Sequence, residues 1–240
     1  MLYLLDGSPP DTPFPDPVRA ETDPNGLLAV GGDLSPKRLL QAYRAGVFPW
    51  FSDGQPILWW SPNPRMVLFP SHLKVSRSLR KTLRRGHYQV SVDQAFEQVI
   101  HACAAPRRDT DGTWLLPHMI DAYTRLYQLG LAHSVETWQD GELVGGLYGV
   151  ALGRAFFGES MFSLADDASK VALVQLAELT GKAGFAFIDC QVHTDHLQRQ
   201  GAEEIPRPRF LQLLRQAQLE PDLGEWALPP RATTCLDAAQ

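Results

Sequence analysis

Hydrophobic and polar residues follow different patterns on the two sides of a proline-rich segment, SPNPR, at residues 61–65. On its N-terminal side we expect a helix over about 36–45, because proline suits the first helical turn and Asp33 or Ser35 can act as the N-cap. Residues 1–24 are rich in proline and acid and predict an irregular arm.

Aromatic residues gather between prolines in the same part of the chain. Trp50, Trp59 and Trp60 lie in the segments AGVFPWFSDG and ILWWSPNPR. Because prolines interrupt regular structure, this density of aromatics favours a small lid or wall over a regular element. We interpret Trp59 and Trp60 as packing residues at a domain interface.

Beyond residue 65 the pattern is typical of short strands and amphipathic helices. Apolar runs predict strands at 66–69 and 88–92. Helices are expected at about 93–104, opened by Asp93, and at 117–129, where proline stands in the first turn and a glycine follows the end.

Three strands follow one another in the centre of the chain: HSVETWQ, ELVGGLYGVAL and RAFFGES. Asp140 and Gly141 join the first two and form a strong hairpin signal. The pattern then predicts a helix over 166–182, a strand over 185–188, and helices at about 195–200 and 207–217.

The fold class that follows is α+β. We expect a small N-terminal domain with a tryptophan-rich wall over residues 1–62, followed by a mixed-sheet domain over residues 63–240.

Composition excludes several classes of protein. Among 240 residues, 44% are hydrophobic and 20% charged, which is enough apolar material for a packed core and excludes a disordered chain. The longest uncharged apolar run, 143–153, is shorter than the ~18 residues that cross a membrane. The opening MLYLLDGSPP lacks a basic lead, so we expect no signal peptide. The 3 cysteines are far apart, and we expect a cytoplasmic protein without disulfides.

The charge is distributed unevenly along the chain. The net charge is −5, yet residues 74–85, KVSRSLRKTLRR, carry six basic side chains and no acid. As a helix, this segment places Leu79 and Leu83 on one face and its cations elsewhere. The candidate phosphate-binding residues are Arg77, Arg80, Lys81, Arg84 and Arg85. The alternative is a solvated helix face without a ligand.

The order of these elements resembles the acyltransferase fold of the N-acetyltransferase superfamily. In that superfamily a glycine-rich loop before a helix holds the pyrophosphate of coenzyme A. Here the corresponding segment reads GESMFSLADDASK, with one glycine and with Asp166 and Asp167 adjacent. Because these carboxylates repel anions, acetyl-coenzyme A is a poor candidate ligand.

Nine short motifs, spread in order over about residues 24–210, carry a more specific resemblance. They are PNGLLAVGGDLSP, AGVFPWFS, ILWWSPNPR, GTW at 112–114, LVGGLYG, GESMFS, ASK at 168–170, IDCQV and EIPR at 204–207. Together they resemble the leucyl/phenylalanyl-tRNA–protein transferases. The resemblance implies transfer of leucine or phenylalanine, and some methionine, from aminoacyl-tRNA to the α-amine of proteins that begin with arginine or lysine. Such a product is marked for degradation, and neither a cofactor nor a metal is expected.

The reaction is aminolysis of an ester, for which orientation and a proton acceptor supply much of the rate. If FAFIDCQV is a strand, Asp189 and Gln191 project from one face. Our hypothesis is that the Gln191 amide orients the attacking amine, and that Asp189, hydrogen-bonded to Gln191, stabilises the developing positive charge. This agrees with the relay proposed for the family. The alternative is that Asp189 binds backbone amides in a purely structural role.

Further site residues follow from the resemblance. Glu159, in GES, is expected to hold the acceptor's amine or its basic side chain, and its apolar neighbours mean that its charge needs a partner. Trp50 and Trp114 resemble the aromatic walls around the terminal adenosine and the aminoacyl group. The residues that line the family's apolar pocket correspond to Phe156, Met161, Ile188, Leu147 and Leu176. Each of these five could instead be ordinary core.

Other polar residues receive no catalytic role. His193 and His196 have helical spacing but no evident third ligand, so we expect no metal site. Thr194 stands where the family commonly has asparagine. Lys170 could assist a phosphate or pair with a neighbouring aspartate. Two rival functions are a coenzyme-A-dependent N-acetyltransferase and a non-catalytic RNA-binding module.

Overall fold

The structure, a computed structural model, describes residues 2–105, 115–219 and 232–233. The N-terminal part contains a four-stranded sheet with the order β1-β2-β4-β3. Its strands are β1 (Tyr3–Leu4), β2 (Leu27–Val30), β3 (Phe48–Pro49) and β4 (Leu58–Trp60). The expectation of an irregular arm and an irregular tryptophan wall is therefore wrong in part. β1 pairs in parallel with β2, and Trp59 and Trp60 lie in a regular strand.

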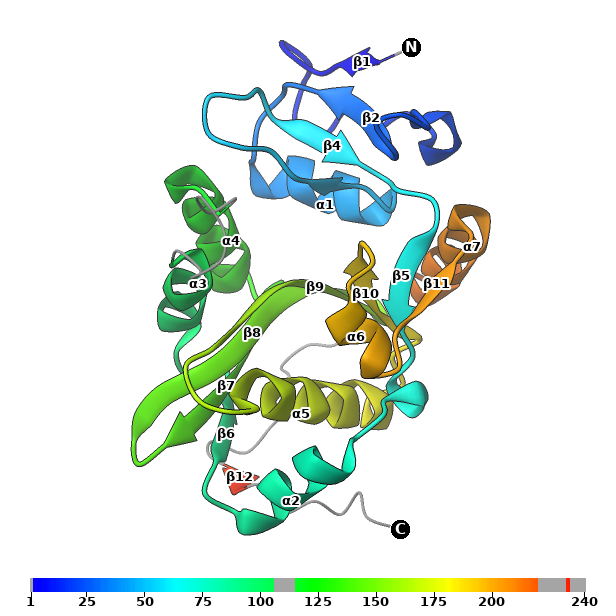
Figure 1. The fold of residues 1–240 in the computed structure, drawn as a ribbon. Helices are drawn as coiled ribbons and strands as arrows, with labels where there is room; N and C mark the ends of the chain where they lie inside the picture. Colours follow the sequence, from blue (N-terminus) through cyan, green and yellow to red (C-terminus); the bar gives the residue numbers. More distant parts are fainter. Residues whose placement is uncertain (1, 106–114, 220–231, 234–240) are drawn as a thin grey trace.

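One helix, α1 (Pro36–Arg44), lies between this sheet and the rest of the molecule (Figure 1). It begins where the sequence predicts, because the Ser35 side chain accepts a hydrogen bond from the Arg38 amide at 3.4 Å. Its inward face carries Leu39 and Tyr43, both fully buried.

The second sheet has eight strands in the order β11-β5-β10-β9-β8-β7-β6-β12. β10 pairs in parallel with β9, whereas its other neighbour β5 is antiparallel, so the sheet is mixed. Asp140 and Gly141 both have positive φ, 52° and 86°, and make the predicted hairpin turn between β7 and β8. The strand bounds are β5 Arg65–Leu68, β6 Gln89–Val92, β7 Ala132–Gln139, β8 Glu142–Leu152, β9 Ala155–Ser163, β10 Phe187–Gln191, β11 Glu203–Ile205 and β12 Ala232–Thr233.

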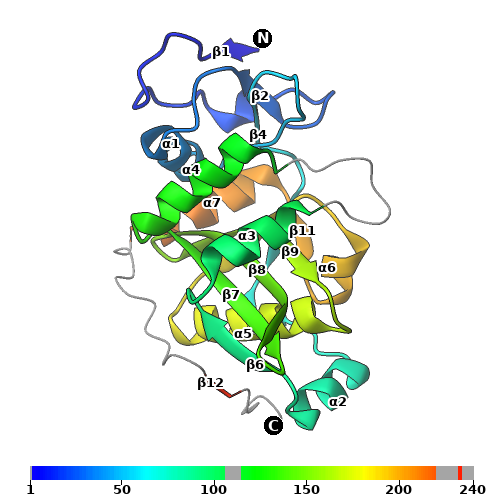
Figure 2. The ribbon, with the colours of Figure 1, turned by 90° about the vertical axis from the view of Figure 1, so that its left-hand side faces the viewer.

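Helices cover both faces of this sheet (Figures 1 and 2). Adjacent residues of β8 point to the two layers: Tyr148 packs with α3, whereas Leu147 packs with α5. The helices are α2 Arg77–Arg85, α3 Phe96–Ala104, α4 Pro117–Gln128, α5 Ala168–Lys182, α6 Asp195–Arg199 and α7 Arg207–Ala217, with short 3-10 turns η1 Pro17–Arg19 and η2 Pro70–His72.

Asp93 does not open α3 as expected. Its φ is 57°, the helix begins at Phe96, and the Asp93 carboxylate instead lies 2.7 Å from His133 Nδ1 and accepts a hydrogen bond from the Ser134 amide at 2.8 Å. Asp93 thus binds two residues of β7 instead of capping α3.

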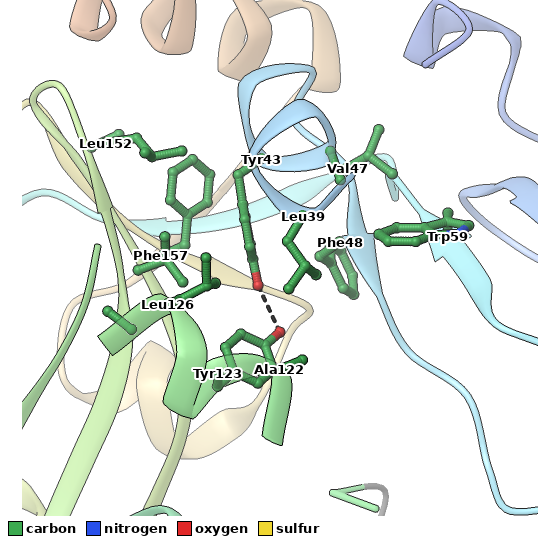
Figure 3. Close-up of a cluster of buried hydrophobic side chains, with 14 of the residues drawn as sticks. Leu39, Tyr43, Val47, Phe48, Trp59, Ala122, Tyr123, Leu126, Leu152 and Phe157 are labelled. Carbon is green, nitrogen blue, oxygen red and sulfur yellow. Dashed lines mark hydrogen bonds between the residues drawn. The ribbon is translucent and has the colours of Figure 1, made fainter. Parts of the chain in front are cut away.

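A continuous hydrophobic core joins the two sheets (Figure 3). Leu39, Val47 and Trp59 from the N-terminal part pack in the same cluster as Leu126 and Phe157 from the second part. The predicted fold class, an α+β chain with a small N-terminal domain before a mixed-sheet domain, is confirmed. Within the described residues, none of the helices has the length and hydropathy needed to traverse a bilayer.

Candidate active site

A cavity of about 440 Å³ opens between the middle of β8 and β9, the C-terminal half of β10, the helices α5 and α6, and the segment around Trp50 after β3. It brings together most residues that the sequence proposed for the site: Trp50, Leu147, Glu159, Met161, Leu176, Ile188, Asp189 and Gln191. Phe156 does not line it and is fully buried in the hydrophobic cluster beneath. Trp114 lies outside the described residues.

One end of the cavity is apolar. Leu147 from β8, Ile188 from β10 and two leucines of α5, Leu173 and Leu176, form this end, and Met161 from β9 contributes a flexible thioether. The four branched side chains are almost completely buried. This end can therefore hold a hydrophobic side chain by burial of apolar surface.

The polar part of the cavity lining centres on Glu159 of β9. Glu159 Oε1 accepts hydrogen bonds from Tyr43 Oη at 2.8 Å and Gln191 Nε2 at 3.3 Å, and Oε2 accepts one from Tyr123 Oη at 2.7 Å. The two tyrosine hydroxyls also lie 2.7 Å from each other, as Figure 3 shows for Tyr43 on α1 and Tyr123 on α4. The partner that the sequence required for this charge is thus a pair of phenols.

Burial determines the acidity of this cluster. Burial raises the pKa of Glu159 to about 7, although the hydrogen bonds from Tyr123 and Tyr43 act in the opposite direction. Burial, followed by the nearby Glu159 charge, raises the pKa values of both tyrosines well above the ordinary value. The tyrosines therefore keep their protons at neutral pH, whereas Glu159 changes its charge in that range.

The hydrogen bond expected between Asp189 and Gln191 is present, but the Gln191 backbone amide donates it rather than the Gln191 side chain. Asp189 is fully buried in a two-bond ion pair with Arg65, whose Nε and Nη2 donate at 2.8 and 2.6 Å. The Arg65 guanidinium lies between the rings of Phe48 and Phe210, 4.7 and 4.5 Å from their centroids. Since Arg65 compensates its charge, Asp189 supplies less electrostatic support to a substrate cation than a free carboxylate would.

Gln191 stands at a β-bulge, so simple alternation of faces does not apply between it and Asp189. Its φ of 59° is a left-handed conformation, and its backbone amide donates to Asp189 Oδ1 at 3.0 Å. The backbone-binding alternative for Asp189 is therefore present in the structure. The Gln191 side chain turns to Glu159, and its Oε1 has no hydrogen bond to the described residues.

The tryptophans separate into rim and core. Trp50 is 47% exposed at the cavity edge, and Trp60 Nε1 donates to its carbonyl at 2.6 Å. Trp59 is fully buried and donates to the carbonyl of Gly31 at 2.9 Å. The packing role proposed for Trp59 and Trp60 thus agrees with their contacts, and Trp50 remains available to a ligand.

The basic helix α2 lies beside α5, on the side of the molecule that is lowest in Figure 1. Leu79 and Leu83 are buried against α5, and a surface hollow is lined by Arg77, Arg80, Lys81, Arg84 and Arg85. No ion pair involves these five side chains among the described residues. Five cations without an ion pair to a described carboxylate favour an anionic partner.

Two polar groups connect this helix to the N-terminus of α5. Asp167 accepts a hydrogen bond from Thr82 of α2 at 3.1 Å and forms an ion pair with Lys170 at 2.6 Å. Lys170 lowers the pKa of Asp167. Of the two roles considered for Lys170, the structure contains the pairing with an aspartate.

The two histidines have different surroundings. His196 lines the cavity, and its Nε2 lies 2.7 Å from Gln200 Nε2, whereas His193 is exposed. Burial, followed by the charges of Lys170 and Arg199, lowers the pKa of His196. No cluster of potential metal ligands occurs in the part of the chain that the structure describes.

Sequence reasoning missed three site residues: Arg65, Tyr43 and Tyr123. Arg65 ends the motif ILWWSPNPR and is the first residue of the buried strand β5, which was a usable signal. The tyrosines carried none, because each belongs to the apolar face of an ordinary amphipathic helix.

Comparisons with known proteins agree with these motifs. Residues 67–215 match the family model described as leucyl/phenylalanyl-tRNA protein transferase, and residues 32–63 match the model of its N-terminal domain. The transferase of that name from Nitrosomonas eutropha is 62% identical over 88% of this chain and 91% of its own. That from Stutzerimonas stutzeri is 57% identical over 90% and 96%. A GCN5-related N-acetyltransferase-like protein from Streptococcus suis is 14% identical, with a TM-score of 0.35 over 67% of this chain and 59% of that chain.

Proposed function

This chain belongs to the leucyl/phenylalanyl-tRNA protein transferase family, and from that premise we propose which proteins it modifies and how its cavity performs the transfer. The activity of the family is transfer of an aminoacyl group from aminoacyl-tRNA to a protein. We propose that the acceptor is the α-amine of a protein that begins with arginine or lysine. The product is marked for degradation, and the reaction takes place in the cytoplasm, where charged tRNA is made and used.

The donor side of the reaction uses the apolar end of the cavity. The leucine or phenylalanine side chain of the ester lies among Leu147, Met161, Leu176 and Ile188, which accept either by shape and exclude polar side chains. Trp50, exposed at the rim, stacks on the terminal adenine. Methionine is a third substrate because its side chain is flexible and apolar.

The tRNA body binds through its phosphates to the cations of α2. Helix α2 packs on α5, whose Leu173 and Leu176 line the cavity, so the acceptor stem and the ester bind on neighbouring elements. Phosphate contacts position a nucleic acid without reading its sequence. Discrimination then depends on the attached amino acid rather than on the tRNA body.

The acceptor side uses the polar part of the cavity lining. The amide oxygen of Gln191 accepts a hydrogen bond from the attacking amine, since its Nε2 is already engaged with Glu159. Asp189 and Arg65 act as positioning residues that hold the bulge at Gln191 through the Gln191 backbone amide. Glu159 binds the cationic amine or the basic side chain of the acceptor.

The observation that carries this proposal is one cavity in which an apolar end meets Glu159 and Gln191. Its test is transfer of labelled leucine from Leu-tRNA to peptides that differ only in their first residue. We expect transfer to peptides that begin with arginine or lysine and none to the same peptides with an acetylated α-amine. Equal transfer to a peptide that begins with alanine would contradict the proposed acceptor.

The same experiment separates the rival functions. Consumption of acetyl-coenzyme A without Leu-tRNA would indicate an acetyltransferase, and binding of tRNA without any transfer would indicate an RNA-binding module. The ion-paired Asp167 before α5 argues against the former, because it places a carboxylate where the pyrophosphate of coenzyme A would bind.

A further inference from the structure

The three oxygen–oxygen contacts among Glu159, Tyr43 and Tyr123 require three protons, whereas the two tyrosine hydroxyls supply only two. Three oxygen–oxygen contacts of 2.7, 2.8 and 2.7 Å link Tyr43, Tyr123 and the Glu159 carboxyl group into a ring. Each has the length of a hydrogen bond between two oxygens and therefore needs one proton. Two phenols supply two protons, so the third contact is filled only when Glu159 is protonated.

The ionised form of the ring is incomplete for the same reason. When both phenols donate to the Glu159 carboxylate, no proton remains between the Tyr43 and Tyr123 oxygens. When Glu159 is neutral, it donates to one phenol, that phenol donates to the other, and the second phenol donates to the free carboxyl oxygen. A neutral Glu159 thus completes the ring, whereas the two phenol hydrogen bonds alone favour the carboxylate, so burial is what raises the pKa of Glu159.

We propose that Glu159 takes a proton from the incoming α-ammonium group and that the contact between Tyr43 and Tyr123 closes a three-proton ring that holds this proton. The proposal rests on the proposed function and adds a catalytic role to the binding role of Glu159. Gln191 bridges the ring and the substrate, because its side chain contacts Glu159 Oε1.

The step balances as follows. The ammonium nitrogen loses one proton to the Glu159 carboxylate and becomes a neutral amine. The amine forms the C–N bond at the ester carbonyl, the C–O bond to the tRNA breaks, and a second nitrogen proton passes to the departing hydroxyl oxygen. Glu159 then releases its proton to water.

The pKa of Glu159 lies close both to that of the amine and to the working pH, which favours this step. The pKa of Glu159, raised by burial to about 7, is close to the ~7.7–8.0 of an N-terminal amine. A base works best when its pKa lies near that of the proton donor and the working pH. The titratable or charged groups that face Glu159 are Tyr43 from α1, Tyr123 from α4, Tyr148 from β8, and the mutually paired Arg65 and Asp189.

The variant Glu159→Gln tests the proposal without removing the ring. A glutamine amide can donate to one phenol and accept from the other, so it imitates the neutral acid but cannot take a proton. We measure single-turnover transfer from Leu-tRNA to a saturating peptide with N-terminal arginine between pH 6.5 and pH 9. At pH 7 the variant should be slower by about tenfold, because only roughly a tenth of the amine is neutral there without a base.

The pH dependence distinguishes a base from a binding group. As pH rises past the pKa of the amine, the substrate becomes neutral by itself, so the ratio of wild-type to variant rate should fall by about tenfold toward pH 9. A variant with an unchanged saturated rate and only a raised KM for the peptide would overturn the proposal. A rate ratio that stays constant with pH would also overturn it.

Phenol-to-phenyl variants test the ring itself. Tyr43→Phe and Tyr123→Phe should each slow the saturated rate at pH 7. Tyr127→Phe is the matched control, because Tyr127 lies one turn further along α4 and its hydroxyl donates to the Asp93 carbonyl instead. Equal rates for all three variants would contradict the ring, with melting temperatures measured to confirm that each folds.

An infrared measurement provides a readout that does not depend on activity. Below pH 7, wild-type protein without substrate should show a protonated-carboxyl band that Glu159→Gln removes. Absence of that band would overturn the ring. If wild type fails to transfer leucine at all, the proposed function fails; if it transfers and Glu159→Gln matches it at every pH, only this inference fails.

Discussion

The cavity and the basic helix α2 arrange their charged groups in opposite ways. In the cavity, each carboxylate already has a partner: the fully buried Asp189 has Arg65, and the partly buried Glu159 has two phenols and an amide. On α2, five cations stand without ion-pair partners among the described residues. Preorganised groups in a cavity select a ligand by its shape and by the hydrogen bonds it can form, whereas surface cations without ion pairs attract any phosphate. The proposed function therefore assigns amino-acid selection to the cavity and phosphate binding to α2.

The largest expected effect concerns the buried ion pair. Asp189→Ala leaves the Arg65 guanidinium uncompensated in the core, which should cost about 3–5 kcal/mol of unfolding free energy. Urea titration measures it. The double variant Arg65→Met with Asp189→Leu should regain much of that loss but not the activity, because the backbone of Gln191 loses its anchor. If Asp189→Ala loses less than ~1 kcal/mol of unfolding free energy, the ion pair is not preorganised and the prediction is wrong.

A second prediction concerns stability against pH. The pKa of Glu159 is raised from 4.5 to about 7, so between these values the folded chain holds a proton that the unfolded chain has lost. The contribution of Glu159 to unfolding free energy should therefore fall as pH rises from 4.5 to 7, by about 3 kcal/mol. Glu159→Gln should lack this component in urea titrations at pH 5 and pH 8. Parallel pH curves for both proteins would contradict a raised pKa.

How far the sequence predicts this molecule depends on the range of the contacts. The long helix α5 and the β7–β8 hairpin were predictable, because periodicity and a two-residue turn are local signals. The strands of the first sheet, from two to four residues long, were not, since a period needs more residues to be visible. Glu159 and Gln191 were found through motifs, whereas Tyr43 and Tyr123 join them across long stretches of chain that carry no local signal.

A third prediction sharpens the selectivity of the cavity. Leu176→Ala enlarges the apolar end and should favour the bulkier substrate. The ratio of kcat/KM for Phe-tRNA to kcat/KM for Leu-tRNA should rise by a factor equivalent to about 1–3 kcal/mol of transition-state free energy. Competition between the two charged tRNAs in one reaction measures this ratio. Leu79→Ala, which removes a buried leucine of α2 instead, is the control and should leave the ratio unchanged.

The smallest effects are expected on α2. Arg80→Ala should weaken binding of charged and uncharged tRNA equally and reduce the slope of log affinity against log salt by about 0.7–0.9. Arg44→Ala, a cation on α1 in the N-terminal part, is a control that should leave the slope unchanged. Equal slopes for Arg80→Ala and wild type would contradict a phosphate contact at this helix.

The division between the two regions is tested most directly by binding of Leu-tRNA and of the same tRNA without leucine over a salt series. Two parallel lines of log affinity against log salt are expected, because both ligands use the same phosphates. The two lines should be separated by an offset that salt does not change. Lines that coincide would show that the cavity does not recognise the aminoacyl group. Lines of different slope would show that the two regions do not act separately.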